Sequence, residues 1–190
     1  MKKLIYDFSN DICSSRGSIL KKHHCHANAR KLLEGKGGLG VKENPSKKLG
    51  TVQCIDCHKG VVSKKKESFD TIKKRCIECH DPSYGDIAVR WKTADDELLK
   101  KLAPKLEQVR EEIEKIEKRG GHSFVFRKLY GEADFNYQLA LKGNGVHNPE
   151  YTQELLTFAN RRLDEATQQL AKRKQEIAQG KMVTAPLRKR

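Results

Sequence analysis

Two short segments of the sequence carry cysteine and histidine at a spacing that suits covalent attachment of haem. Residues 54–58 read CIDCH and residues 76–80 read CIECH. In such a CxxCH motif, two thiols add to the vinyl groups on one edge of haem, and the next residue places an imidazole on the iron. The motifs predict two haem c groups, with Cys54, Cys57, Cys76 and Cys79 as attachment residues and His58 and His80 as proximal iron ligands.

The same four cysteines also satisfy the spacing of a zinc ribbon, because 18 residues separate the two CxxC pairs. A basic zinc-ribbon binding protein is therefore an alternative. A ribbon gives no reason for a histidine directly after both second cysteines, and it leaves Cys13 and Cys25 unexplained. The first half of the chain also lacks the alternating strands that a ribbon needs. These observations favour haem over zinc.

A third attachment site is predicted upstream of the two CxxCH motifs. Cys25 and His26 form the second half of a haem motif. The nearest earlier cysteine is Cys13, and eleven residues lie between Cys13 and Cys25. All six cysteines are then used in three pairs, and each pair ends in a histidine. We expect a third haem c here, with His26 as proximal ligand. A disulfide between Cys13 and Cys25 is the alternative in an oxidising compartment.

Four further histidines are candidates for the distal position on iron: His147, His122, His24 and His23. Low-potential electron carriers hold iron between two imidazoles, which keeps water and substrates off the metal. His122 precedes a predicted helix cap at Ser123, and His147 precedes a predicted helix start at residues 148–149. Both therefore lie at helix entrances that hold a side chain in place. The sequence leaves open which histidine serves which haem.

The elements that must position these residues differ between the two halves of the chain. A helix is predicted after Ser18, through the histidine cluster at 23–26, with Gly35 as its stop signal, and residues 35–53 are predicted to be loop. A long amphipathic helix is predicted from an N-cap at Thr93, with apolar residues alternating at threes and fours. Pro104 either kinks that helix or begins its main portion.

Two more helices are predicted in the second half. One runs from Ser123 to about Lys142, and the other begins with Asn148 as cap and Pro149 at its first position and continues towards Gly180. Because the connections are short, we expect the helices to pack antiparallel. The predicted fold is mostly α, with a haem-packed, loop-rich N-terminal half followed by long antiparallel helices.

This organisation predicts three regions. Residues 1–92 would carry the three haem attachment sites, residues 93–180 would supply distal ligands and helix packing, and residues 181–190 would form a disordered tail. Hydrophobic residues make up 36% of the chain and charged residues 34%, which is little apolar material for an ordinary core. Bound haem would supply the missing interior of the first region.

The formal net charge of +14 predicts a basic surface that steers acidic redox partner proteins. No nucleic acid partner is expected, and no apolar stretch reaches the roughly 18 residues of a membrane span. Haem is attached to CxxCH motifs outside the cytoplasm, so we expect a periplasmic or secreted protein of respiration. The residues after Lys2 and Lys3 lack the apolar core of a signal peptide, so we expect no signal peptide in this chain.

Residues 135–137 (FNY) and 145–151 (GVHNPEY) resemble the C-terminal helical region of the ammonia-forming cytochrome c nitrite reductases and their octahaem relatives. In that family the histidine of the HNP segment is a distal haem ligand, and the resemblance implies this role for His147. It also implies long helices that form oligomer contacts. The pentahaem members bind substrate at a haem attached by CxxCK, and the chain contains no CxxCK. What the resemblance implies for this chain is therefore the architecture of haems followed by long packing helices, and not nitrite reduction.

The sequence thus predicts an iron-containing, metal-binding electron-transport protein: a multihaem cytochrome c that moves electrons between redox partners through three haems, each expected to be ligated by two histidines. An electron carrier is favoured over an enzyme, and no catalytic residue is assigned. The alternative is a multihaem oxidoreductase of the nitrite or hydroxylamine type, or a fragment of one, with one open haem. The long helices are also expected to support a homo-oligomer.

Overall fold

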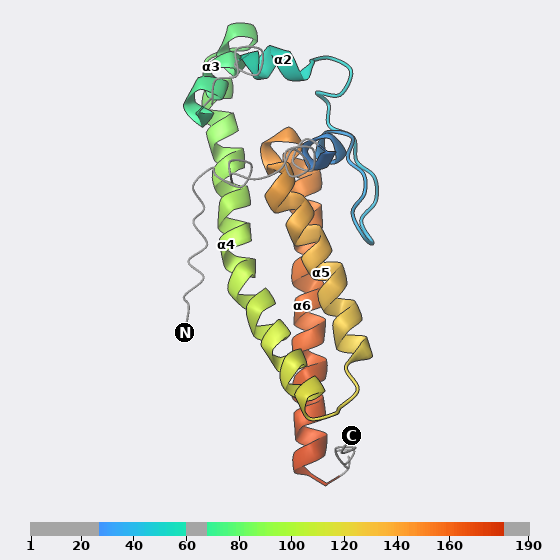
Figure 1. Ribbon diagram of the computed structural model, residues 1–190. Helices are drawn as coiled ribbons and strands as arrows, with labels where there is room; N and C mark the ends of the chain where they lie inside the picture. The colour runs from blue at the N-terminus through green and yellow to red at the C-terminus, as the bar shows by residue number, and fades with distance from the viewer. Residues whose placement is uncertain (1–26, 60–67, 181–190) are drawn as a thin grey trace, which may run out of the picture.

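The computed structural model describes residues 27–59 and 68–180, and the elements in these ranges are helices and connecting loops (Figure 1). Residues 27–33 are helical and are followed by a loop. The later elements are α2 (Cys54–Cys57), α3 (Phe69–Cys79), α4 (Ser83–Lys118), α5 (Phe124–Gly143), the 3-10 helix η2 (Gly145–His147) and α6 (Pro149–Ala178). The prediction of a mostly α protein with long antiparallel helices is confirmed.

Helix α4 begins eleven residues earlier than predicted from the sequence. Thr93 was expected to cap its N-terminus, but it lies inside the helix, whose first residue is Ser83. The carboxylate of Asp81 accepts a hydrogen bond from the Ser83 backbone N–H at 2.9 Å, which satisfies one of the free donors of the first turn. The threonine and acidic residues at 93–96 resemble a cap in composition only. Pro104 lies within a single continuous helix.

The boundaries of α5 and α6 follow the predicted turn and cap residues. Helix α5 ends at Gly143, and Asn144 has a positive φ of 59°, which reverses the chain before η2. Asn148 caps α6 by accepting a hydrogen bond from the backbone N–H of Tyr151 at 3.2 Å, and Pro149 occupies the first position. These features place α5 and α6 side by side and antiparallel.

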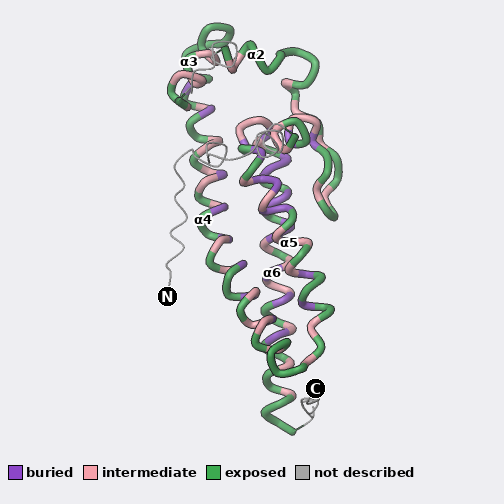
Figure 2. Tube along the Cα trace, viewed as in Figure 1, coloured by how far each residue is buried: buried purple, intermediate pink, exposed green. Residues whose placement is uncertain are grey.

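The core is the seam between α4, α5 and α6 (Figure 2). One apolar face of each of α4 and α6 is buried: Leu102, Leu106, Val109 and Ile113 on α4, and Leu156, Ala159, Leu163, Ala166 and Leu170 on α6. Fully buried side chains include Ile113, Leu163 and Tyr137. Helices α2 and α3, in contrast, contain no buried residue. They lie at the end of the bundle where α4 begins (Figure 1). Their packing partner is therefore not the bundle core.

A loop over residues 35–46 lies against α5 and α6 and anchors the N-terminal part of the described chain. The side-chain amide of Asn136 binds both backbone groups of Leu39, at 2.8 and 2.9 Å. The Tyr151 hydroxyl accepts from the N–H of Gly38 at 2.8 Å. Asn148 donates to the carbonyls of Leu32 (3.0 Å) and Asn44 (2.7 Å). These bonds attach the loop to α5 and to the start of α6.

Several predictions concern residues outside the described ranges. The attachment residues Cys13 and Cys25, the ligand His26, and the candidates His23 and His24 all precede residue 27. The predicted tail at 181–190 also lies outside the described residues. Within residues 27–59 and 68–180, no helix combines the length and apolar content needed to cross a membrane.

Candidate functional site

Each CxxCH motif lies on one turn of helix with its histidine at the helix end. Cys54 and Cys57 span α2, and Cys76 and Cys79 form the last turn of α3. Residues three apart lie on the same face of a helix, so each turn presents its two thiols together. His58 and His80 are the C-caps, and their backbone N–H groups donate to the carbonyls of the first cysteine of each motif at 2.9 Å. All four thiols are free.

The two motifs pack against each other. Helices α2 and α3 are in contact, and Lys59 forms an ion pair with Glu78 at 2.7 Å between them. Burial raises the pKa of the Cys57 thiol, and the nearby Cys76 thiol raises it further. Large apolar side chains around the motifs are exposed, among them Ile55 (52%) and Ile77 (45%). Exposed apolar groups beside free thiols suit a flat apolar ring system that covers them.

His147 is held in η2 with one ring nitrogen occupied. Its Nδ1 lies 2.9 Å from the carbonyl oxygen of Gly143 and 2.8 Å from that of Asn144. Because carbonyl oxygens only accept, Nδ1 carries the proton and donates it, and the lone pair of Nε2 is available for a metal. Burial lowers the pKa of the imidazole. The neutral ring is the form that binds a metal, and a backbone hydrogen bond on the other nitrogen is the usual arrangement for a metal-binding histidine.

The ring of His147 faces the ring of His58. Their centroids are 6.1 Å apart and their planes differ by 27°. An imidazole nitrogen binds a transition metal at about 2.0–2.1 Å, so two rings on opposite sides of one metal have centroids roughly 6–6.5 Å apart. The two rings are stacked, and their separation is about that of two imidazole ligands of one metal ion. The structure therefore brings together the histidine of the first CxxCH motif and a histidine at the other end of the sequence. The residues present fit a haem with two histidine ligands.

His80 has a different environment. Its ring stacks on Tyr84, with centroids 4.3 Å apart and planes 15° apart, and its residue is exposed at the surface. Tyr84 lies in the first turn of α4, directly after the motif. The stacked tyrosine ring covers one face of the imidazole and fixes its orientation.

The structure does not bring His122 to the motifs. His122 lies in the turn between α4 and α5, while Cys76–Cys79 precede the opposite end of α4 (Figure 1). Its side chain is exposed, and its backbone carbonyl accepts from the guanidinium of Arg173. The sequence analysis treated His122 and His147 alike because both precede a helix. The antiparallel path of α5 separates them by the length of that helix.

Three residues near the site were missed in the sequence analysis. The ammonium of Lys48 donates to the carbonyl of Val146 at 2.6 Å and lies 4.9 Å from the centre of the Trp91 ring. Asp95, one turn after Trp91, is 3% exposed, and neither of its carboxylate oxygens has a hydrogen-bond partner. Burial, and to a lesser extent the charge of Asp96, raises the pKa of Asp95 to about 7. Nothing in the local sequence distinguishes Lys48 and Asp95 from neighbouring charged residues.

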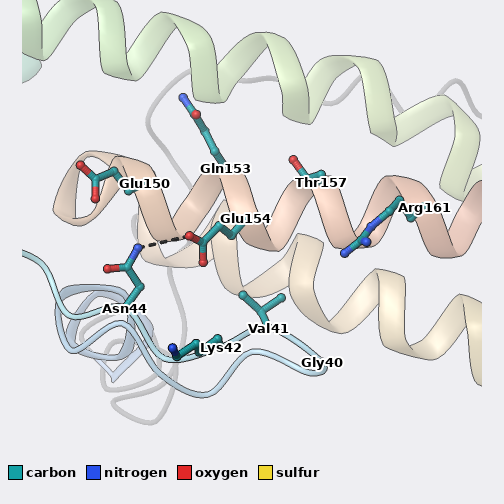
Figure 3. Close-up of a pocket in the computed structure, with 9 residues that line it drawn as sticks. All are labelled: Gly40, Val41, Lys42, Asn44, Glu150, Gln153, Glu154, Thr157 and Arg161. Carbon is teal, nitrogen blue, oxygen red and sulfur yellow. Dashed lines mark hydrogen bonds between the residues drawn. The ribbon is translucent and has the colours of Figure 1, made fainter.

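A second surface feature is a groove of about 560 Å³ between the loop at 40–44 and α6 (Figure 3). Glu150, Glu154 and Arg161 line it with other polar residues, and Asn44 bridges to Glu154 at 3.2 Å. Its lining contains neither cysteine nor histidine. In residues 27–59 and 68–180, no three of the acidic, cysteine and histidine residues converge to bind an ion. The chemistry-bearing groups are therefore those around α2, α3 and η2.

Comparison with known proteins gives one match. The family model for cytochrome c552 matches residues 45–190, which include both CxxCH motifs, all the long helices and His147. No curated protein and no solved structure matches the chain.

Proposed function

The chain belongs to the cytochrome c552 family of multihaem c-type cytochromes, which are related to nitrite reductases, and we propose that it transfers electrons between redox partners through three covalently bound haems. Family membership implies covalently bound haem c. The number of haems, their ligands and the direction of electron flow are our proposals.

The observation that carries the proposal is the pairing of His58 with His147 across 6.1 Å. We assign His58 as the proximal ligand and His147 as the distal ligand of the haem attached at Cys54 and Cys57. The hydrogen bonds from Nδ1 of His147 to two carbonyls fix the ring and increase the basicity of Nε2. Two imidazoles leave no coordination position for water or substrate, which suits electron transfer.

A second haem is assigned to Cys76 and Cys79, with His80 as proximal ligand. A third is assigned to Cys13 and Cys25, with His26 as proximal ligand. The haems supply the one-electron chemistry. The chain holds them close together: the contact between α2 and α3 keeps the first two motifs adjacent, and the Lys59–Glu78 ion pair spans that contact.

We assign the haem attachment sites to residues 1–92 and the distal ligand His147 and the helix packing to residues 93–180. The basic composition, with 39 lysine and arginine residues against 25 acidic residues, favours acidic redox partners. Because haem is attached to CxxCH motifs outside the cytoplasm, we propose that the protein works in the periplasm or the extracellular space. The long helices supply a surface for a homo-oligomer.

An alternative function is reduction of a small nitrogen compound at an open haem. The exposed position of His80, whose ring contacts Tyr84, is the observation that favours it, together with the relation of the family to nitrite reductases. A high-spin signal, or binding of cyanide or nitrite at one iron, would support this function. Three low-spin centres would exclude it.

The test is a haem count combined with ligand substitution. We expect the intact mass of the native protein to correspond to three haems and its reduced spectrum to be of the c type. In His147→Ala, one low-spin centre should be lost while the haem count stays constant, because the cysteines are unchanged. His122→Ala is the matched control and should keep all low-spin signals. A colourless zinc protein would refute the function, and a two-haem mass would refute the assignment of Cys13 and Cys25.

A further inference from the structure

Lys48 lies close to the first CxxCH motif and to the turn that carries His147. It lies in the loop before α2, and its ammonium bonds to the carbonyl of Val146, the residue directly before His147. The ring of Trp91 lies beneath the ammonium at 4.9 Å. The side chain therefore connects the segment leading to the first CxxCH motif with the turn that carries the proposed distal ligand.

The ammonium of Lys48 is partly buried and has no partner of opposite charge within residues 27–59 and 68–180. No carboxylate among the described residues lies within ion-pair distance of it, whereas Lys59, Lys92 and Lys105 each pair with an acidic side chain. The thiols of Cys57 and Cys76 are close enough to act on its charge. A cation in such surroundings is costly unless an anion or strong hydrogen bonds compensate it.

We propose that the positive charge of Lys48 raises the reduction potential of the haem attached at Cys54 and Cys57. The inference rests on the proposed function, because it needs haem at this motif. Adding one electron to ferric iron lowers the positive charge of the centre, and a nearby cation stabilises the form with less positive charge. Removal of the cation therefore favours the ferric form.

The size of the effect follows from Coulomb's law. A unit charge about 10 Å from the iron, in surroundings with an effective dielectric constant of about 20, changes the equilibrium for reduction by roughly tenfold. For one electron, a tenfold change corresponds to 59 mV. Trp91 strengthens the effect because its ring keeps water from one side of the ammonium.

The test is a redox titration of the intact holoprotein, followed by absorbance, with the haem count measured by mass in every variant. Lys48→Met removes the charge and keeps the apolar stem, and Lys48→Gln is a second neutral variant that can still donate to Val146. Each neutral variant that folds should lower the midpoint potential of one haem by about 59 mV. Lys48→Arg should stay close to the wild-type potential. The matched control is Lys47→Met, because that neighbouring side chain is exposed and should have no effect.

Two results would overturn the inference: neutral variants with the wild-type potentials at full haem content, or a Lys48→Arg variant whose potential falls as far as that of Lys48→Met. A wild-type protein without haem at Cys54 and Cys57 would instead refute the proposed function. Mass measurement separates the two failures.

Discussion

Replacement of Asp95 by asparagine should change how the stability of the protein depends on pH. The carboxyl group is 3% exposed and has no hydrogen-bond partner, and its pKa in the folded protein is about 7, against 3.8 for an ordinary aspartate. Desolvation is the main cause, the charge of Asp96 adds to it, and Lys92 opposes it. The folded state therefore keeps a proton that the unfolded state loses.

The sign and size of the effect follow from linkage. Below about pH 4 both states hold the proton, so Asp95 makes no pH-dependent contribution to stability. Between about pH 4 and pH 7 only the unfolded state releases it, and the free energy of unfolding falls as the pH rises. Above pH 7 both states are ionised and the loss is complete. At about 1.36 kcal/mol per pKa unit, a shift of about three units gives a total of roughly 4 kcal/mol.

The assay is urea unfolding of the oxidised holoprotein at several values between pH 4 and pH 8. Asp95→Asn removes the titration, so its stability relative to wild type should rise across this window by roughly 4 kcal/mol. Asp86→Asn is the matched control, because that side chain lies on the same helix and is 80% exposed. Parallel pH profiles for wild type and Asp95→Asn would show that Asp95 ionises normally in the folded protein and would refute the reasoning.

Three further predictions concern packing and hydrogen bonding. Asn148→Ala should lower the free energy of unfolding by about 2–4 kcal/mol in urea titrations, because two carbonyls and the α6 cap lose a partner. Leu163→Ala should cost about 2–5 kcal/mol at this fully buried site, whereas Ile177→Ala at the exposed end of α6 should cost far less. Gly145→Ala should destabilise the turn, since a Cβ there would overlap the carboxylate of Asp95, while Gly131→Ala, with open space around its Cβ, should raise the melting temperature.

The helical half of the fold could be predicted from the sequence because its signals are local. Asn148 and Pro149 define the start of α6, and the spacing of its apolar residues defines its buried face. The start of α4 could not be placed in the same way, since the cap-like residues at 93–96 lie inside a longer helix. Its first turn is set by Asp81 and Pro82, within the segment that follows a haem motif.

The candidate site could be predicted only in part. The CxxCH motifs are identified by spacing alone, but the pairing of His58 with His147 depends on contacts between segments almost ninety residues apart, which no local pattern reports. His122 and His147 have equivalent sequence contexts and opposite positions in the bundle. Lys48 and Asp95 are identified by what they lack, a carboxylate partner and a hydrogen-bond donor among the described residues, and such features exist only in three dimensions.

The anchoring of the loop at 35–46 also sets an order of events in time. Leu39 binds Asn136 across 97 residues of sequence, and Asn44 binds Asn148 across 104. During synthesis from the N-terminus, the loop has no surface to dock on until α5 and α6 have been made, and contacts of such long range form late in folding. The thiols of both CxxCH motifs therefore emerge well before the loop is secured. During this interval the cysteines are accessible for reaction, and the loop docks on α5 and α6 afterwards.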